Sequence, residues 1–339
     1  MQGGISSSVL KLRFYNNLAK LLFMVQLKIE FKMAQPRIVV VGAGVCGLTI
    51  ARLLQDAKIE VILLEKSNSA GGRMATRRVE DYVFDHGAQF YKSSIEKPFF
   101  WHHRWTEEKI SQVWFSEDRF SFYCSAHGMN SLAKNLAQNL NIRFNQKLIT
   151  IGNSSTNQRL VLEDGDELSA DLVILTCPLP QSLEILSNSQ VNFSEELKKI
   201  EYAKALVGLV QVQSHAVDIK YQLSKSAIFS ISNNFSKAMG KGLGLTVVMN
   251  QDFSEKYFAS SDSEVLDLIH FELGKTFNIQ SLPLKSQLKK WRFSHPIQKH
   301  PENFVVLPSV ILAGDAFGGG SLAGAVNSAT SVARHILEG

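Results

Sequence analysis

Three closely spaced glycines and a later acidic residue are the part of this sequence whose types and spacing point most directly to chemistry. Gly42, Gly44 and Gly47 separate an apolar run from a segment of helical spacing, and a second apolar run ends in Glu65. In such a turn the first glycine permits a tight bend, the second a close approach of phosphate, and the third close packing of helix on strand. We therefore predict a dinucleotide-binding unit in which Glu65 accepts hydrogen bonds from a ribose.

The residues that follow Glu65 help to distinguish between dinucleotides. Gly71-Gly72-Arg73 comes within a few positions, and nicotinamide dehydrogenases do not usually continue in this way. A Gly-Gly-Arg at this place resembles flavoproteins related to glutathione reductase and the amine oxidases, in which the turn lies beside FAD. The resemblance implies that Gly72 and Arg73 contact FAD, with Arg73 as a fixed cation for its phosphate or ribityl region. A surface salt bridge is the alternative for Arg73.

A second glycine-rich segment lies near the C-terminal end of the chain. An apolar strand there runs into Gly314-Asp315, and residues 322–337 have the spacing of a helix. We expect Asp315 to accept a hydrogen bond from a ribityl hydroxyl, and the first helical amides, near Gly324 and Ala325, to face the pyrimidine ring of the flavin. Because the two half-sites are far apart in sequence, we predict a discontinuous nucleotide-binding domain.

The sequence between these half-sites indicates the order of the domains. Strand-like runs occur at 143–151, 205–212, 227–231 and 243–249, and a helical pattern spans 263–273. We predict an α/β fold, with a discontinuous Rossmann-like FAD-binding domain and a second, α+β substrate domain. The predicted boundaries are an N-terminal extension 1–32, FAD-binding segments 33–95, 128–191 and 302–339, a substrate-domain insertion 96–127 and a substrate domain 192–301.

Several motifs together resemble the renalase family from about Arg37 onwards. They are Gly42–Gly47, Gly71-Gly72-Arg73-Met74, Gly87-Ala88-Gln89, Lys290-Trp291-Arg292 and Gly314-Asp315. Renalases are FAD-dependent oxidases with a domain layout like that of p-hydroxybenzoate hydroxylase. The resemblance implies FAD contacts at Cys46, Arg73, Gln89 and Phe90. The sequence departs from the family at His86, where renalase has leucine, and at Phe90, where it has tyrosine.

Four residues are predicted to serve the substrate or the reaction. Lys204 precedes the predicted strand 205–212, and in amine oxidases a lysine near this place can hold a water on flavin N5; a solvated strand flank is the alternative. Trp291 and Arg292 are expected to line the substrate pocket, although neighbours on a strand point to opposite sides, so that only one of them enters it. An arginine there would suit the phosphates of a nicotinamide dinucleotide. Gln89 is expected to project at the flavin face.

Three function hypotheses follow. The first is a renalase-like oxidase that takes hydride from a reduced nicotinamide dinucleotide and uses O₂ as acceptor, giving H₂O₂. The second is a flavin amine oxidase or dehydrogenase, and the third is a non-catalytic FAD-binding scaffold. Covalent attachment of the flavin is not expected, because no Cys or His lies between Gly314 and Arg334.

Charge and cysteine content bear on nucleic-acid binding, metal binding and cellular location. Five basic residues and one acidic residue lie within 1–32, so this segment carries +4 of the net charge of +5 and the body only +1, which gives no electrostatic footprint for nucleic acid. The three cysteines are scattered, without metal-ligand spacing, and favour a reducing cytoplasm. No metal site and no firm membrane association are predicted. We interpret residues 1–32 as an extension outside the fold, with Met33 as the natural start.

Overall fold

The computed structural model describes residues 36–338, apart from 154–156, 213–218, 280–284 and 309. The predicted N-terminal extension and the start at Met33 therefore lie outside the described residues. At the centre of the molecule is a six-stranded sheet in the order β18-β19-β12-β1-β2-β8, parallel except for the β18–β19 pair. Its strands are β1 (Ile38–Val41), β2 (Val61–Glu65), β8 (Asn141–Phe144), β12 (Leu172–Leu175), β18 (Val305–Val306) and β19 (Val310–Leu312).

The central sheet is covered on both faces, which explains why β1 and β12 are continuous apolar runs rather than alternating ones. On one face Ile38 and Val40 share a core with three helices, and on the other Val39 and Val41 share a core with a helix and a small antiparallel sheet. The first layer contains α2 (Val45–Asp56), α4 (Asn130–Ala137) and α9 (Ser321–Glu338). The second contains α5 (Leu179–Asn188), with α6 (Glu195–Lys198) after it, and β9 (Leu148–Asn153), β10 (Gln158–Leu162) and β11 (Glu167–Ala170).

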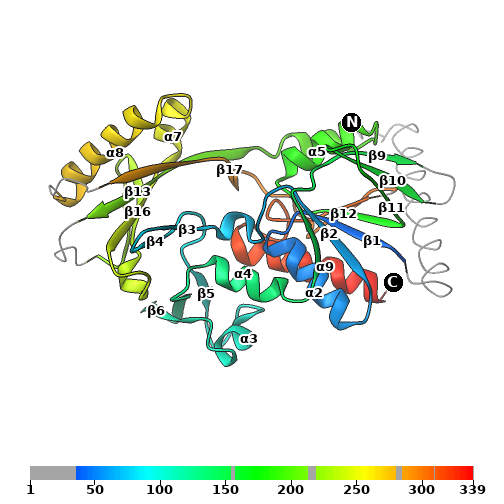
Figure 1. Cartoon of the computed structure of the whole chain (residues 1–339), viewed down its shortest axis with the longest axis horizontal. Coiled ribbons are helices and arrows are strands. Elements are labelled where there is room, and N and C mark those ends of the chain that lie inside the picture. Colours follow the sequence, from blue (N-terminus) through cyan, green and yellow to red (C-terminus); the bar gives the residue numbers. More distant parts are fainter. Residues whose placement is uncertain (1–35, 154–156, 213–218, 280–284, 309, 339) are drawn as a thin grey trace, which may run out of the picture.

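An aromatic-rich subdomain packs beneath α2 and α4 (Figure 1). Its buried indoles join the core of the central sheet, and the Trp101 Nε1–H donates to Thr49 Oγ1 of α2 at 2.9 Å. Trp114 instead donates to Ser236 Oγ at 2.8 Å, so this block also contacts the lobe formed by residues 202–296. Its elements are β5 (Tyr91–Ser93), α3 (His102–Glu107), β6 (Gln112–Glu117) and β7 (Phe120–Cys124). The assignment of 96–127 as a substrate-domain insertion stays a prediction.

A five-stranded antiparallel sheet in the order β14-β15-β16-β13-β17 forms the second lobe, at the left of Figure 1. Two helices cover one face of this sheet, and the β3–β4 hairpin packs against the other. The strands are β13 (Tyr202–Val212), β14 (Tyr221–Leu223), β15 (Ile228–Asn233), β16 (Leu243–Met249) and β17 (Ser286–Pro296). The other elements are α7 (Gln251–Tyr257), α8 (Asp262–Phe277), β3 (Thr76–Val79), β4 (Tyr82–Asp85) and the short 3₁₀ turns η1 (Gly72–Met74) and η2 (Phe235–Lys237).

Two expectations about elements are wrong. The run predicted as one strand over 143–151 is divided between β8 and β9, because Asn145 turns the chain with a φ of 57° and Gln146 N–H donates to Glu65 O. Lys204 does not precede its strand but lies inside β13, opposite an irregularity in the pairing with β17.

Candidate active site

The first glycine turn leaves open space where a dinucleotide phosphate is expected. Gly42 has a φ of 103°, and a Cβ on Gly47 would overlap the Gly42 carbonyl oxygen, so both positions require glycine. A Cβ on Gly44, in contrast, would meet nothing within 4 Å. Gly44 is also the N-cap of α2, and no side chain caps this helix end. The first amides of α2 are therefore available to an anion in front of Gly44.

Glu65 ends β2 beside this turn and is held there by neutral donors. Its Oε2 accepts from Ala43 N–H at 2.8 Å, and its Oε1 accepts from Ser67 N–H and Oγ–H at 2.8 and 2.7 Å. The side chain is buried without a cation in these contacts. A fixed carboxylate at the end of the second strand matches the expected ribose acceptor.

The Gly-Gly-Arg turn and the C-terminal half-site meet through Arg73 and Asp315. Gly71 N–H donates to Ala43 O at 2.8 Å, which sets this turn directly against the first glycine turn. The Arg73 guanidinium binds both Asp315 oxygens, at 2.5 and 2.7 Å, and Tyr202 O–H donates to the same carboxylate at 2.9 Å. Burial alone would lower the pKa of Arg73, but Asp315 outweighs it and the pKa is raised. The two predicted cofactor ligands thus neutralise each other in a planar pair.

The turn that precedes α9 is built from residues in the left-handed region. Gly318, Gly319, Gly320 and Ser321 all have positive φ, and a Cβ on Gly324 would crowd the backbone of Gly318 and Gly319. The predicted contact Ala325 is buried beside Gly324 at the start of the helix.

Cys46, another predicted FAD contact, lies at the start of α2 close to Ser328 of α9. Gly314 N–H donates to Ser328 Oγ at 3.0 Å, so the two helices and the Gly-Asp turn converge at this point. Burial and then the Asp315 charge raise the pKa of the Cys46 thiol, which is therefore neutral.

The loop after β4 lies against the Gly-Gly-Arg turn. Ala88 N–H donates to Arg73 O at 2.8 Å, and a Cβ on Gly87 would overlap the same carbonyl. Gln89 does not project freely from this loop. Its Nε2 donates to Asp85 O and Gly87 O at 2.8 and 3.0 Å, and its Oε1 accepts from Lys237 Nζ at 3.0 Å. A direct contact of this amide with the flavin stays a prediction that the geometry does not favour.

Phe90 continues the loop into an aromatic cluster. Its ring meets Phe122, Tyr221 and Phe115 edge to face, with centroids 4.9, 5.2 and 6.1 Å apart, and Trp114 lies 6.3 Å away. The cluster joins the aromatic-rich subdomain to β14 of the second lobe.

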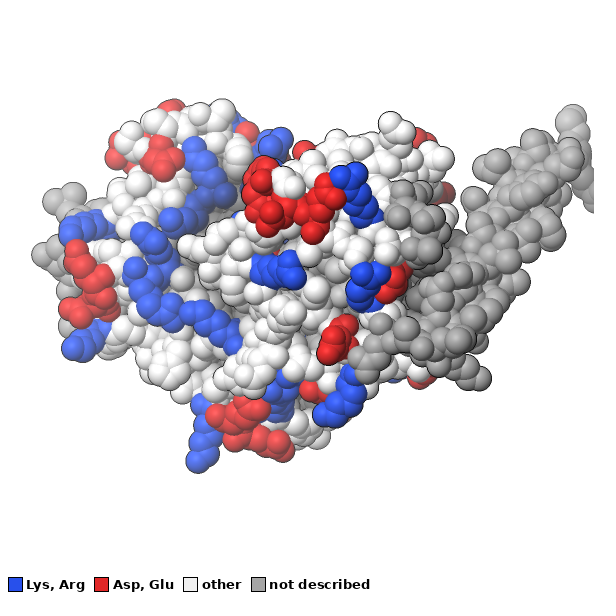
Figure 2. Space-filling view, turned by 45° about the vertical axis from the view of Figure 1, so that its right-hand side comes forward, with Lys and Arg blue, Asp and Glu red and all other residues white. Residues whose placement is uncertain are grey.

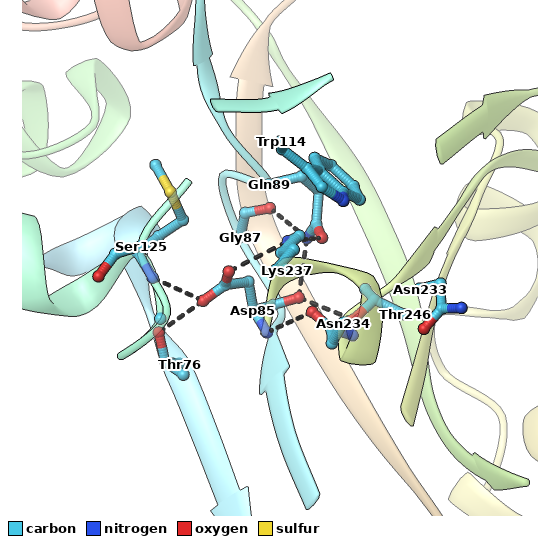
Figure 3. Close-up of polar contacts among 12 residues, drawn as sticks. Thr76, Asp85, Gly87, Gln89, Trp114, Ser125, Asn233, Asn234, Lys237 and Thr246 are labelled. Atoms are coloured by element: carbon cyan, nitrogen blue, oxygen red, sulfur yellow. Dashed lines mark hydrogen bonds and ion pairs between the residues drawn. The ribbon is translucent and has the colours of Figure 1, made fainter. Parts of the chain in front are cut away.

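A buried ion pair that the sequence analysis missed anchors the same loop (Figure 3). Lys237 Nζ lies 3.1 Å from Asp85 Oδ2, and both side chains are 0% exposed. Thr76 Oγ1–H and Met129 N–H donate to the other oxygen of Asp85, at 2.7 and 2.8 Å. The Lys237 ammonium also lies 4.6 Å from the centroid of the Trp114 ring. Lys237 belongs to the loop between β15 and β16, so this pair fastens the second lobe to the loop beside the expected cofactor site.

The predicted catalytic and substrate residues are separated by the second sheet. Lys204 Nζ binds Glu255 Oε2 of α7 at 2.6 Å, on the face that the helices cover. Trp291 lies on the opposite face, where its indole stacks on His86 at 5.5 Å and donates to His86 O at 2.7 Å. Arg292 is exposed, with its guanidinium 5.7 Å from the centroid of the Phe293 ring. The water-holding role of Lys204 is therefore not supported, because its ammonium is turned away from the loop after β4.

Comparison with known proteins decides the family. A family model described as flavin-containing amine oxidoreductase matches residues 90–337, and one for an NAD(P)-binding Rossmann-like domain matches residues 40–102. The chain belongs to the flavin-containing amine oxidoreductase family. FAD is accordingly its cofactor, and the chain is classed with the FAD-dependent oxidoreductases.

Curated relatives of this amine oxidoreductase match mostly in short segments. Polyamine oxidase 4 of Oryza sativa subsp. japonica is 25% identical over 177 residues, which are 49% of this chain and 35% of the relative. L-amino-acid oxidase of Mus musculus is 44% identical over 61 residues, 18% of this chain and 10% of the relative. The relatives are thus matched over about a third of their length or less.

Solved structures match over nearly the whole chain. A protein from Exiguobacterium sp. 255-15, named "Putative protoporphyrinogen oxidase", aligns with a TM-score of 0.69 at 15% identity, over 91% of this chain and 100% of that one. A triple mutant of putrescine oxidase aligns with a TM-score of 0.66 at 13% identity, over 90% and 99%. These similarities confirm the predicted α/β fold with its Rossmann-like domain.

The described residues contain neither a candidate metal-binding cluster nor a helix that could span a membrane. Within the described residues, no three His, Cys, Asp or Glu side chains gather in a way that could hold a metal ion. In the same part of the chain, no helix is long and apolar enough to cross a bilayer.

Proposed function

We propose that this amine oxidoreductase is a renalase-like oxidase whose donor is a reduced nicotinamide dinucleotide and whose acceptor is O₂. Bound FAD would supply the redox chemistry, accepting a hydride from the donor and passing two electrons to O₂ to give H₂O₂. The first amides of α2 would hold its diphosphate and Glu65 its ribose. The Asp315 turn and the start of α9 would lie along its ribityl chain and ring.

The observation that carries the choice of donor is the pairing of two carboxylates, Asp85 and Asp315, beside the expected cofactor site. Asp85 is held by Lys237, and Asp315 is held by Arg73. A protonated amine donor needs a carboxylate or an open aromatic cage to replace its hydration. Because both carboxylates already have a cation, the site suits a neutral ring better than an ammonium group.

A flavin amine oxidase is the second candidate, and the aromatic cluster around Phe90 favours it. It supplies several aromatic rings, which can hold an organic cation, and relatives named for polyamines and amino acids are among those that the chain matches. A non-catalytic scaffold is the third candidate. No observation favours it over the two enzymes, because the glycine turns and Glu65 would serve an FAD-binding scaffold and an FAD enzyme alike.

Anaerobic reduction of the bound flavin separates the three candidates. The purified holoenzyme is mixed with dihydronicotinamide dinucleotides, including isomers reduced at other ring carbons, and separately with primary and secondary amines. We expect the dihydronicotinamides to bleach the flavin and the amines to leave it oxidised. Bleaching by amines alone would establish the second candidate. If neither panel bleaches the flavin, the third candidate gains support.

The flavin is proposed to be held without a covalent bond. Denaturation followed by centrifugation is expected to leave intact FAD in the supernatant, whereas yellow colour in the precipitate would disprove this. The cytoplasmic location inferred from the sparse cysteines likewise stays a prediction.

A further inference from the structure

A group of basic and aromatic side chains lies beside the loop after β4, on the face of the second sheet that carries Trp291. In β17, Lys289 and Trp291 are two residues apart and therefore point to the same side of the strand. Lys289 is paired with Val207 and Trp291 with Ala205, and both partners belong to the apolar cluster beneath the β3–β4 hairpin. The immediate neighbour Lys290 points to the other face, where it binds Asp262 of α8 at 3.3 Å.

The hairpin contributes a second cation to the same region. Arg77 is paired with Phe84, whose buried ring packs in that apolar cluster, so Arg77 faces the second sheet. Its neighbour Arg78 points the other way and donates to His127 O at 2.6 Å. Within the described part of the chain, neither Arg77 nor Lys289 has an ion pair or a side-chain hydrogen bond. In the space-filling view, Lys and Arg side chains form a band along the boundary between this lobe and the rest of the molecule (Figure 2).

His86 stacks on Trp291 and is close enough to both cations to feel their charge. Its Nδ1 is buried without a hydrogen-bond partner. The pKa of His86 is lowered to about 4, mainly by burial and then by repulsion from Lys289 and Arg77, while the Asp85 charge acts in the opposite direction. Both cations therefore act on the imidazole electrostatically. The arrangement combines two cations lacking counter-ions with a buried imidazole nitrogen lacking a partner. An anionic group would pair with the cations and would accept a hydrogen bond from this nitrogen when it carries the ring proton.

We propose that Arg77, Lys289 and His86 form the binding site for the phosphate groups of the electron donor, with Trp291 as its aromatic wall. The assignment rests on the proposed function, since it places the dinucleotide's charged part beside the loop that flanks the cofactor. It also moves the expected phosphate contact from the exposed Arg292 to residues on the Trp291 face.

A binding experiment tests the site without turnover. The holoenzyme, whose own diphosphate site is filled by FAD, is titrated with inorganic pyrophosphate while the ring protons of His86, assigned with a His86→Gln variant, are followed by NMR. We expect pyrophosphate to raise the pKa of His86, because the anion offsets the repulsion from both cations. In the double variant Arg77→Gln/Lys289→Gln, the pKa of His86 is expected to be raised without any anion, and pyrophosphate is expected to change it no further. An unchanged His86 titration with pyrophosphate in the parent enzyme would overturn the proposal.

A kinetic experiment uses donors that differ in charge. We expect Arg77→Gln/Lys289→Gln to raise KM for a dihydronicotinamide dinucleotide about tenfold or more with little change in kcat, as for lost uniform binding. A neutral N-benzyl dihydronicotinamide is expected to be oxidised equally well by parent and variant. The matched control is Arg78→Gln/Lys290→Gln, which removes the same two charges from the opposite faces and should leave both donors unaffected.

The two experiments separate failure of the site from failure of the proposed function. If no dihydronicotinamide reduces the flavin but pyrophosphate still moves the His86 pKa, the proposed donor is wrong and the anion site stands. If the dinucleotide is oxidised and its KM is the same in Arg77→Gln/Lys289→Gln as in the parent enzyme, the proposed donor is correct and the proposed phosphate site is wrong. An equal rise of KM in the control pair would also overturn the site, because the effect would then be general electrostatics.

Discussion

Two lysine–carboxylate pairs in the second lobe differ in almost everything except their chemistry. Lys204 and Glu255 lie 2.6 Å apart with side chains 34% and 41% exposed, whereas Lys237 and Asp85 lie 3.1 Å apart with both side chains fully buried. Lys204 and Glu255 are the closer pair, yet we expect them to contribute less to the free energy of unfolding. Water and salt screen the first pair, so its worth is about 0–1 kcal/mol. Loss of one partner from the second leaves a charge stranded in the interior.

The difference shows that burial, rather than position next to a motif, gives a lysine its importance here. Lys204 was predicted to be catalytic because it adjoins a predicted strand and resembles a position in known flavoenzymes. Lys237 occurs in an ordinary loop sequence, Asn-Phe-Ser-Lys-Ala, and its partner is 152 residues away. Lysine is almost never fully buried unless paired, so Lys237 and Asp85 are buried together or not at all.

The largest expected effect is that of Lys237→Met. The variant leaves the Asp85 side chain buried without its cation and is expected to lose about 3–5 kcal/mol of unfolding free energy, measured by chemical denaturation. Lys237→Met/Asp85→Asn should recover part of this loss, because neither charge then remains buried. A single variant within 1 kcal/mol of the parent enzyme would show that the pair does not hold the lobe to the loop.

Glu65 extends the comparison to a buried carboxylate whose three hydrogen bonds come from neutral donors. Glu65→Ala is expected to weaken FAD binding by about 1.5–3 kcal/mol, the usual worth of a hydrogen bond to a charged group, while the protein remains folded. Reconstitution of the apoprotein, followed by flavin fluorescence, gives the dissociation constant. Glu255→Ala, which removes an exposed carboxylate, is the control. Equal FAD affinity in both variants would exclude Glu65 as the ribose ligand.

The smallest expected effect is that of Lys204→Met. Its partner Glu255 is partly solvated and tolerates the loss, so unfolding free energy should change by no more than about 1 kcal/mol. Flavin reduction rates in stopped flow should equal those of the parent enzyme. A large fall in the reduction rate without a change in stability would restore the catalytic role that the sequence suggested and reverse the ranking of the two lysines.

The sequence predicted the central layers well because their signals are local. The strand expected at 243–249 coincides with β16, and the helix expected at 322–337 differs from α9 by one residue at each end. Glycine spacing likewise located the first glycine turn, where Gly42 and Gly47 are required by backbone geometry alone. These features depend on periodicity and sterics, which a single chain segment carries with it.

What the sequence did not predict depends on contacts between distant segments. Arg73 was expected to face the cofactor, but its partner Asp315 comes from the other end of the domain. The inward turn of Gln89 follows from Lys237, which lies in the other lobe. The opposite orientations of Lys289 and Lys290 could be predicted as an alternation, but which of them faces the hairpin is decided by the register of β17 on β13.

The position of β19 has a consequence for synthesis of the protein on the ribosome. β12 is an apolar strand paired with β1 on one side, and its other neighbour, β19, begins 135 residues after β12 ends. At roughly 5–20 residues per second, the nascent chain exposes that unpaired edge for about 7–27 seconds. The turn at Asp315 and the first turn of α9 are translated later still. Capture of the flavin by both half-sites therefore belongs to the last stage of folding, after β19 has become available to cover that edge.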